Sequence, residues 1–344
     1  MPTPVLQLPP RVRHGDTVAI VSPSWHAAGS FSHRVERGRA YLEALGLRVR
    51  IMPNACVVGE WTAGTPRQRV DDLHAAFTDP DVRVVLCAIG GNHANELLEL
   101  LDYDLVAANP KVFQGLSDIT VLHAAFARHA GLATFYGPAF VTNLAEYPEV
   151  PALTNRSLRA AWFGDAPLAH EPATEWTDEF LDFAVQADLT RARATKPGAG
   201  WTWLREGVAT GPVTGGCLET LCWHVKGSTE WPDLEGAILL LETSELAPSP
   251  GEVAAYLTDL RRLGVFDQIV GLVFARPANY RGDAVARLWR VVSDAVGDRD
   301  VPILANVDVG HTDPMLTVPL GVPAVLDSKT STFRTLDAPT ADRP

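Results

Sequence analysis

A serine lies at the point where an apolar strand pattern gives way to a helical one. Ser117 follows the run 112–116, and a helix-like pattern begins at Ile119. A hydroxyl at such a strand–turn–helix junction projects from the end of a sheet beside the N–H groups of the next helix, which suits a nucleophile. The position also suits a helix N-cap, in which Ser117 would accept a hydrogen bond from Ile119 or Thr120. This stretch alone leaves both interpretations open.

Two further reactive side chains end apolar strand patterns in the second half of the chain. Glu242 follows the run 236–241, and His311 ends the run 301–311. A neutral imidazole can accept the proton of a serine hydroxyl, and a carboxylate fixes its tautomer and stabilises the imidazolium. A structural salt bridge is the competing interpretation for Glu242, because a buried carboxylate needs a partner. Ten histidines occur in the chain, and His93, in a glycine loop, competes most strongly with His311 as base.

The first half predicts alternating strands and helices. Strand patterns cover 16–24, 47–52, 82–89 and 112–114, and helical patterns cover 35–45 and 67–77, with a further helix starting at 96. This alternation is typical of βαβ units and a mostly parallel sheet. Ligands bind beyond the carboxyl ends of such strands, so the loops 22–25, 90–95 and 115–118 should meet there. The pair Gly90-Gly91 lets backbone approach a ligand closely, although a plain tight turn explains it equally well.

The second half predicts another α/β unit. We divide the chain into an N-terminal α/β domain over 1–165, a linker with a lid-like loop over 166–205, and a C-terminal α/β domain over 206–344. Residues 249–252 form a capping box before a helix over 253–263, and further elements are predicted at 269–274 and 284–296. We expect a closing hairpin over 312–321 and a frayed end after about residue 337. The tryptophans of the linker favour packing over ligand contact.

Composition excludes several classes of function. Apolar residues make up 47% of the 344, which allows large cores, and the net charge of −12 opposes binding to nucleic acid or anionic membranes. The four cysteines show no metal-ligand spacing, so we expect free thiols in a reducing compartment and no metal or cofactor. The first ten residues lack a basic, apolar leader, and no apolar run is long enough to span a membrane. We therefore expect a cytoplasmic, soluble protein.

Three separated motifs give the chain a specific family resemblance. The segments 115–120, 242–245 and 308–321 resemble the LD-carboxypeptidase family of serine peptidases, and the similarity extends from Gly15-Asp16 to Leu326-Asp327. The resemblance implies a flavodoxin- or amidotransferase-like N-terminal domain with a parallel sheet, a smaller α/β C-terminal domain, an active site between them and a homodimer. It implies the roles nucleophile, base and orienting acid for Ser117, His311 and Glu242.

The resemblance also implies how the substrate is held. The oxyanion would bind the backbone N–H groups of Gly91 and Asp118, and the substrate would contact Gly90 and Asn92. A tryptophan of the inter-domain loop stacks on the nucleobase in one branch of the family, and Trp201 is the nearest candidate by position.

Two branches of the family differ at the glycine loop. Murein-recycling members typically carry Arg-Gly-Gly, whereas this chain has an isoleucine before the glycine pair and so resembles the microcin-immunity branch. The segments 101–104, 109–111 and 134–138 agree with that branch. Its members cleave the amide between an amino acid or peptide and a sulfamoyl- or phosphoramidate-linked adenosine. The chain departs from the branch at Cys217 and Glu219, where the branch often has asparagine, and at Leu246, where lysine can occur. Cleavage of murein tetrapeptides is the alternative activity.

Overall fold

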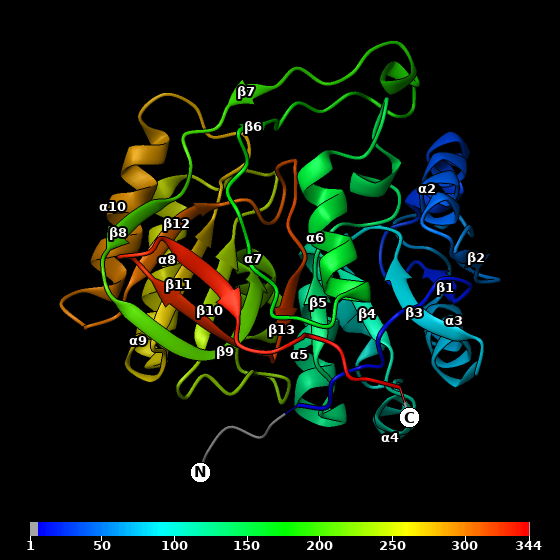
Figure 1. Ribbon diagram of the computed structural model, residues 1–344, viewed down its shortest axis with the longest axis horizontal. Helices are drawn as coiled ribbons and strands as arrows, with labels where there is room; N and C mark the ends of the chain where they lie inside the picture. Colours follow the sequence, from blue (N-terminus) through cyan, green and yellow to red (C-terminus); the bar gives the residue numbers. More distant parts are fainter. Residues whose placement is uncertain (1–5, 344) are drawn as a thin grey trace.

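The computed structural model describes residues 6–343 and contains two α/β halves side by side (Figure 1). Each half is built on its own sheet. The predicted absence of a leader rests partly on residues 1–5, which lie outside the described residues. No helix between residues 6 and 343 is long and apolar enough to cross a membrane.

The first sheet has the strand order β13-β5-β4-β3-β1-β2, in which β13 is Val318–Leu320. Strands β1 to β5 are parallel and follow the flavodoxin-like order, which confirms the predicted fold class. Apolar clusters cover both faces of this sheet, as a buried parallel sheet requires. The strands are β1 (Thr17–Val21), β2 (Arg48–Ile51), β3 (Val82–Cys87), β4 (Val112–Gly115) and β5 (Thr134–Tyr136). The helices are α1 (Ala27–Ser30), α2 (Ser32–Ala44), α3 (Pro66–Thr78), α4 (Tyr103–Ala108), α5 (Thr120–Ala125) and α6 (Ala152–Phe163).

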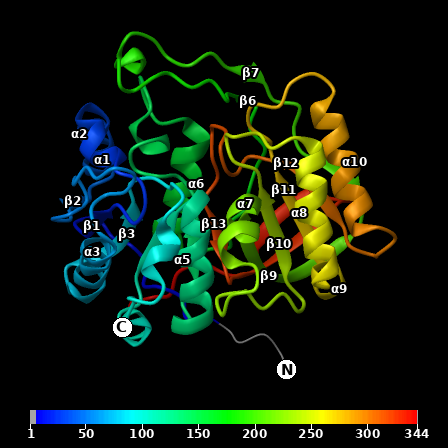
Figure 2. The same cartoon turned by 180° about the vertical axis from the view of Figure 1, so that it is seen from behind.

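The second sheet has the order β15-β14-β9-β10-β11-β12-β8. Its four central strands are parallel, and antiparallel strands flank them. The strands are β8 (Thr202–Arg205), β9 (Val208–Cys217), β10 (Ile238–Glu242), β11 (Gly271–Ala275), β12 (Ile303–Val307), β14 (Pro323–Asp327) and β15 (Thr332–Thr335). Helices α8 (Pro250–Arg262), α9 (Val265–Gln268) and α10 (Ala284–Val296) pack on its outer face, and α7 (Leu218–Thr220) follows β9 (Figure 2). The predicted capping box of Ser249 and Glu252 begins α8.

Three local predictions were wrong. The segment 312–321 forms no hairpin, because its buried strand β13 (Val318–Leu320) returns to the first sheet and pairs antiparallel with β5. The helix expected from residue 96 is only a 3₁₀ turn over Ala94–Leu97. The C-terminal segment is held rather than frayed, since Arg343 donates to the Arg11 carbonyl oxygen and pairs with Asp16.

The segment between the halves runs over the same edge of both sheets and carries the short strands β6 (Glu175–Trp176) and β7 (Lys196–Pro197) (Figure 1). Thr177 and Asp313 exchange backbone hydrogen bonds of 2.7 and 3.0 Å across it. Arg193 pairs with Glu146 at 2.8 Å and with Asp313 at 2.6 Å. These contacts position the segment over the candidate site.

Candidate active site

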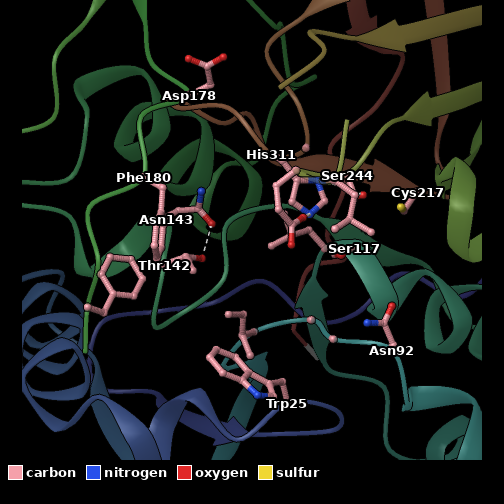
Figure 3. Close-up of a pocket in the computed structure, with 18 of the residues that line it drawn as sticks. Trp25, Asn92, Ser117, Thr142, Asn143, Asp178, Phe180, Cys217, Ser244 and His311 are labelled. Carbon is pink, nitrogen blue, oxygen red and sulfur yellow. Dashed lines mark hydrogen bonds and ion pairs between the residues drawn. The ribbon is translucent and has the colours of Figure 1, made fainter. Parts of the chain in front are cut away.

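A cavity of about 810 Å³ is lined by residues of both halves and of the segment over them. Ser117 and His311 lie in the same part of it, whereas Phe180 and Trp25 lie across from them (Figure 3). In residues 6–343, no group of three or more His, Cys, Asp or Glu side chains is arranged to hold a metal ion.

Ser117 occupies a strained turn at the end of β4. Its φ of 62° lies in the left-handed region, which non-glycine residues rarely adopt. Of the two interpretations left open for Ser117, the structure does not support the N-cap: the N–H of Ile119 donates to the Leu116 carbonyl oxygen at 3.2 Å, and the Ser117 hydroxyl has no hydrogen-bond partner among the described residues. A strained turn with a free hydroxyl on a cavity is the arrangement of a nucleophile elbow.

The three loops predicted to meet at the sheet edge do meet there, and Asp118 joins them. Its Oδ2 accepts hydrogen bonds from Ser24 Oγ at 2.7 Å and from the N–H groups of His93 and Ala94, each at 2.8 Å. Asp118 lies at the start of a 3₁₀ turn, where a backbone N–H has no acceptor within the turn. The aspartate side chain therefore holds the glycine loop against the turn that carries Ser117.

Glycine is required at positions 90 and 91 because neighbouring atoms lie too close for a side chain. A Cβ at Gly90 would lie 2.8 Å from Ser117 Cβ, and a Cβ at Gly91 would lie 2.3 Å from Ser24 Oγ. Gly91 also has a φ of 146°, which disfavours side chains. Gly90, Gly91 and Asn92 all line the cavity. The pair thus lets one loop pack directly against the serine turn.

Glu242 and His311 form a pair in which the carboxylate is buried and the imidazole is partly exposed. His311 Nδ1 lies 2.8 Å from Glu242 Oε2, and Glu242 is only 1% exposed at the end of β10. Gly310 fits between them because a Cβ there would lie 2.6 Å from the carboxylate. Burial alone would lower the pKa of His311, but the charge and hydrogen bond of Glu242, with the nearby charges of Glu245 and Glu219, raise that pKa to about 9. The pair can hold an imidazolium.

The second nitrogen of His311 is occupied in this structure. Its Nε2 lies 3.0 Å from Glu245 Oε2, and the Glu245 side chain is 63% exposed. A base that serves Ser117 must present Nε2 to the serine hydroxyl. Glu245 must therefore move before His311 can accept that proton.

Tyr136 links Ser117 to Glu242, and the chemical patterns of the sequence did not single it out. Its hydroxyl accepts a hydrogen bond from the Ser117 N–H at 2.8 Å and donates one to Glu242 Oε1 at 2.6 Å. The residue lies fully buried at the end of β5, like the serine and the acid at their strand ends. That shared position was the available signal. Tyr136 connects the backbone of the serine turn to the acid of the other half.

Two other histidines have structural partners. His123 is buried between Thr134 Oγ1 and the Gly115 carbonyl oxygen, and burial lowers its pKa to about 4. His93 lines the cavity, but its Nδ1 lies 3.3 Å from Glu96. His311 is the histidine that combines a buried carboxylate with a place on the cavity beside Ser117.

Comparison with known proteins assigns the family. Residues 18–137 match the LD-carboxypeptidase N-terminal domain, and residues 210–326 match the LD-carboxypeptidase C-terminal domain. A putative carboxypeptidase of Vibrio cholerae is 31% identical over 329 residues, which cover 94% of this chain and 96% of the relative. The chain belongs to the LD-carboxypeptidase family. The resemblance inferred from the three motifs is thereby confirmed, and a serine peptidase activity is supported.

Two other relatives of this LD-carboxypeptidase family member have names that describe different substrates. A probable murein peptide carboxypeptidase of Bacillus subtilis is 27% identical over 327 residues, covering 94% of this chain and 92% of the relative. The microcin C7 self-immunity protein MccF, solved in complex with aspartyl sulfamoyl adenosine, superposes with a TM-score of 0.90 at 27% identity, covering 97% of this chain and all of MccF. Both similarities span nearly the whole chain, so overall similarity does not identify the substrate.

The structure does not bring Trp201 to the cavity of this family member. Its indole Nε1 donates to Asp308 Oδ2 at 2.9 Å, and its ring packs edge-on against Phe333 beside the second sheet. The lining residues do not include it. The expectation that Trp201 stacks on a nucleobase is therefore wrong for this conformation. Other aromatic side chains line the cavity instead: Trp25, Phe31, Trp61, Phe180, Phe183 and Trp223.

Proposed function

We propose that this protein is a serine hydrolase that cleaves the amide bond of acylated nucleotide analogues, of the kind formed by microcin-type aminoacyl or peptidyl adenylate mimics. Such an activity would provide self-immunity or detoxification. The observation that carries the proposal is the Glu242–His311 pair beside the free hydroxyl of Ser117, in a cavity that is also lined by aromatic side chains. Planar aromatic groups suit stacking on a nucleobase.

The chemistry follows from the roles of these residues. Ser117 Oγ attacks the scissile carbonyl carbon while His311 Nε2 accepts the hydroxyl proton, and Glu242 stabilises the imidazolium through Nδ1. The N–H groups of Gly91 and Asp118 would hold the oxyanion. His311 then returns the proton to the leaving nitrogen, which leaves an acyl-enzyme ester on Ser117. Water, deprotonated by the same histidine, hydrolyses that ester and restores the serine hydroxyl.

Cleavage of murein tetrapeptides is the second candidate. The same three residues would act on the peptide bond of the terminal residue, and a relative named as a murein peptide carboxypeptidase is similar over 94% of the chain. The aromatic lining of the cavity favours the nucleotide analogue, since a peptide ending in alanine offers no planar group to stack.

Removal of the nucleophile tests the mechanism. Ser117→Ala should reduce hydrolysis of an aminoacyl-sulfamoyl adenosine by about 10⁴-fold or more, because no alkoxide equivalent remains to form the acyl-enzyme. The readout is kcat by chromatography, with circular dichroism to show that the fold persists. Ser30→Ala, at an exposed serine of α1, is the control that should keep full activity. Undiminished turnover by Ser117→Ala would contradict the proposal.

The two substrates can be separated directly. Purified enzyme is incubated with an aminoacyl-sulfamoyl adenosine and, separately, with murein tetrapeptide, and kcat/KM is compared. We expect a larger value for the nucleotide analogue. A larger value for the tetrapeptide would assign the protein to cell-wall recycling.

Location is an expectation from composition and the N-terminal sequence, and assembly is an expectation from the family resemblance. We propose a cytoplasmic homodimer with a small-molecule or peptide substrate and without nucleic-acid or membrane partners. Light scattering at several protein concentrations would measure the mass, for which twice the 37.2 kDa chain is expected.

A further inference from the structure

The candidate active-site cavity is acidic. Eight carboxylate side chains line it against two guanidinium groups. Both guanidinium groups are already paired, Arg34 with Asp188 and Arg193 with Glu146 and Asp313. Neither is free to bind a negatively charged substrate group without breaking these pairs.

Glu219 is a buried carboxylate of the cavity lining that, within residues 6–343, forms no ion pair with a basic side chain. It is 2% exposed, lines the cavity, and belongs to α7 at the end of β9. Its Oε1 accepts hydrogen bonds from the N–H and Oγ of Ser244, at 2.9 and 2.7 Å. Its Oε2 has only the weak contact with Cys217 Sγ at 3.7 Å, and no basic side chain of residues 6–343 forms an ion pair with it. Burial raises the pKa of Glu219, and the charge of Glu242 adds to this effect. A positively charged ligand group that reaches this carboxylate would stabilise its ionised form.

Glu219 lies close to the reacting groups. Its charge contributes to the raised pKa of His311, and its hydrogen-bond donor Ser244 is next to Glu245, which contacts His311 Nε2 at 3.0 Å. Figure 3 shows Ser244 and His311 in the same part of the cavity. Glu219 and Glu245 thus place two carboxylates beside the point where an acyl group would bind Ser117.

Apolar surface lies beside these carboxylates. Trp223, four residues after Glu219, lines the cavity and is 48% exposed, and Leu246, directly after Glu245, lines it and is 67% exposed. An alkyl chain that ends in an ammonium group matches this combination, because its methylene groups can cover apolar surface while its charge meets a carboxylate.

The position of the aromatic residues orients the substrate. Trp25 and Phe180 lie across the cavity from Ser117 and His311 (Figure 3). A nucleobase stacked on that side leaves the acyl residue on the side of Glu219. The ligand named for MccF carries an aspartyl group, which a site with two carboxylates would repel.

We propose that Glu219, together with Glu245, makes the acyl subsite of this enzyme selective for amino acids with a positively charged side chain, such as lysine or ornithine. This inference rests on the proposed hydrolysis of acylated nucleotide analogues. It assigns Glu219 as a specificity-determining residue that contacts the substrate ammonium.

The test compares three substrates that differ in the charge of one side chain: lysyl-, norleucyl- and aspartyl-sulfamoyl adenosine. Lysine and norleucine have the same carbon chain, so their ratio of kcat/KM isolates the ammonium group. We expect the wild-type enzyme to favour lysyl over norleucyl by about tenfold or more and to cleave the aspartyl compound least. Glu219→Gln keeps an oxygen for the Ser244 donors, and it should bring the lysyl-to-norleucyl ratio close to one. Glu206→Gln, at an exposed position, should leave the ratio unchanged.

The possible outcomes distinguish failure of the proposed charge selectivity from failure of the proposed hydrolase activity. Equal kcat/KM for the lysyl and norleucyl compounds in the wild type would overturn the proposed selection for a positively charged side chain. An unchanged ratio in Glu219→Gln would do the same. Neither result would affect the proposed hydrolase activity. Absence of turnover with all three compounds overturns both. The wild-type comparison decides the matter even if the variant does not fold, which thermal unfolding would reveal.

Discussion

At the scale of single residues, His311 is held between two carboxylates that favour its charged form. Glu242 contacts Nδ1 at 2.8 Å and Glu245 contacts Nε2 at 3.0 Å. A pKa raised to about 9 means that the imidazole of the free enzyme is mostly protonated at pH 7. A protonated imidazole cannot accept the proton of Ser117. Activity should therefore rise with pH through about 9 rather than through the ordinary histidine range.

Glu245 offers a direct test of this dependence. Glu245→Gln removes one of the charges that raise the pKa of His311, so the neutral base should be present at lower pH. We expect the acidic limb of kcat/KM to move to lower pH, with up to about a tenfold gain at pH 7 per unit of pKa. The measurement is a pH profile of each enzyme with an uncharged norleucyl substrate. Glu206→Gln, at an exposed position outside the cavity lining, should keep the wild-type limb, and an unmoved limb in Glu245→Gln would contradict the assignment.

At the scale of elements, the site depends on turns that follow parallel strands and touch one another. The turn after β4 carries Ser117, and the turn after β3 carries Gly90 at a separation that excludes a side chain. Thr120 joins the serine turn to the second half, since its hydroxyl donates to the Ser117 carbonyl oxygen at 2.7 Å and accepts from the Cys217 N–H at 2.9 Å. The backbone around Ser117 is therefore set by elements of both halves.

Gly90→Ala tests the contact between the turns. The new Cβ would lie 2.8 Å from Ser117 Cβ and 3.2 Å from the Asp118 backbone nitrogen, so the serine turn must shift. A misplacement of this size should lower kcat by about 100-fold. Gly251→Ala is the control because the nearest atom to its Cβ would be 3.8 Å away, and it should retain activity. Wild-type kcat for Gly90→Ala, measured at saturating substrate, would show that the contact is unimportant.

At the scale of the whole molecule, the segment between the halves is fastened to both of them through buried ions. Arg193 is 16% exposed and bridges Glu146, which is 10% exposed, and Asp313, which is 9% exposed. Burial tends to lower the pKa of Arg193, but the charges of Asp313 and Glu146 raise it, so the guanidinium stays charged. Loss of this cation would leave two carboxylates buried side by side.

Arg193→Met should therefore destabilise the fold by about 3 kcal/mol, because the remaining charges are desolvated without a partner. Urea unfolding followed by tryptophan fluorescence would measure the change. Arg191→Met is the matched control: it breaks the exposed pair with Glu179 in the same segment and should change stability little. Equal effects of the two substitutions would show that the buried bridge adds no stability.

The sequence by itself predicted most of the local elements and the candidate reactive residues at their ends. Alternating apolar strands and helices predicted the parallel sheet, and Ser117, Glu242 and His311 were recognised because each follows a strand pattern. Those features depend on neighbouring residues, which periodicity records. The family could also be inferred from the sequence, because three short motifs occur in the expected order along the chain.

Only the tertiary structure decided how distant segments meet. The return of β13 to the first sheet, the hydrogen bonds of Tyr136 to Ser117 and Glu242, and the contact of Glu245 with His311 all join residues far apart in the chain. Trp201 was misplaced for the same reason, since its partner Asp308 lies 107 positions away. Such contacts depend on packing between whole elements, and a local pattern of residues carries no record of them.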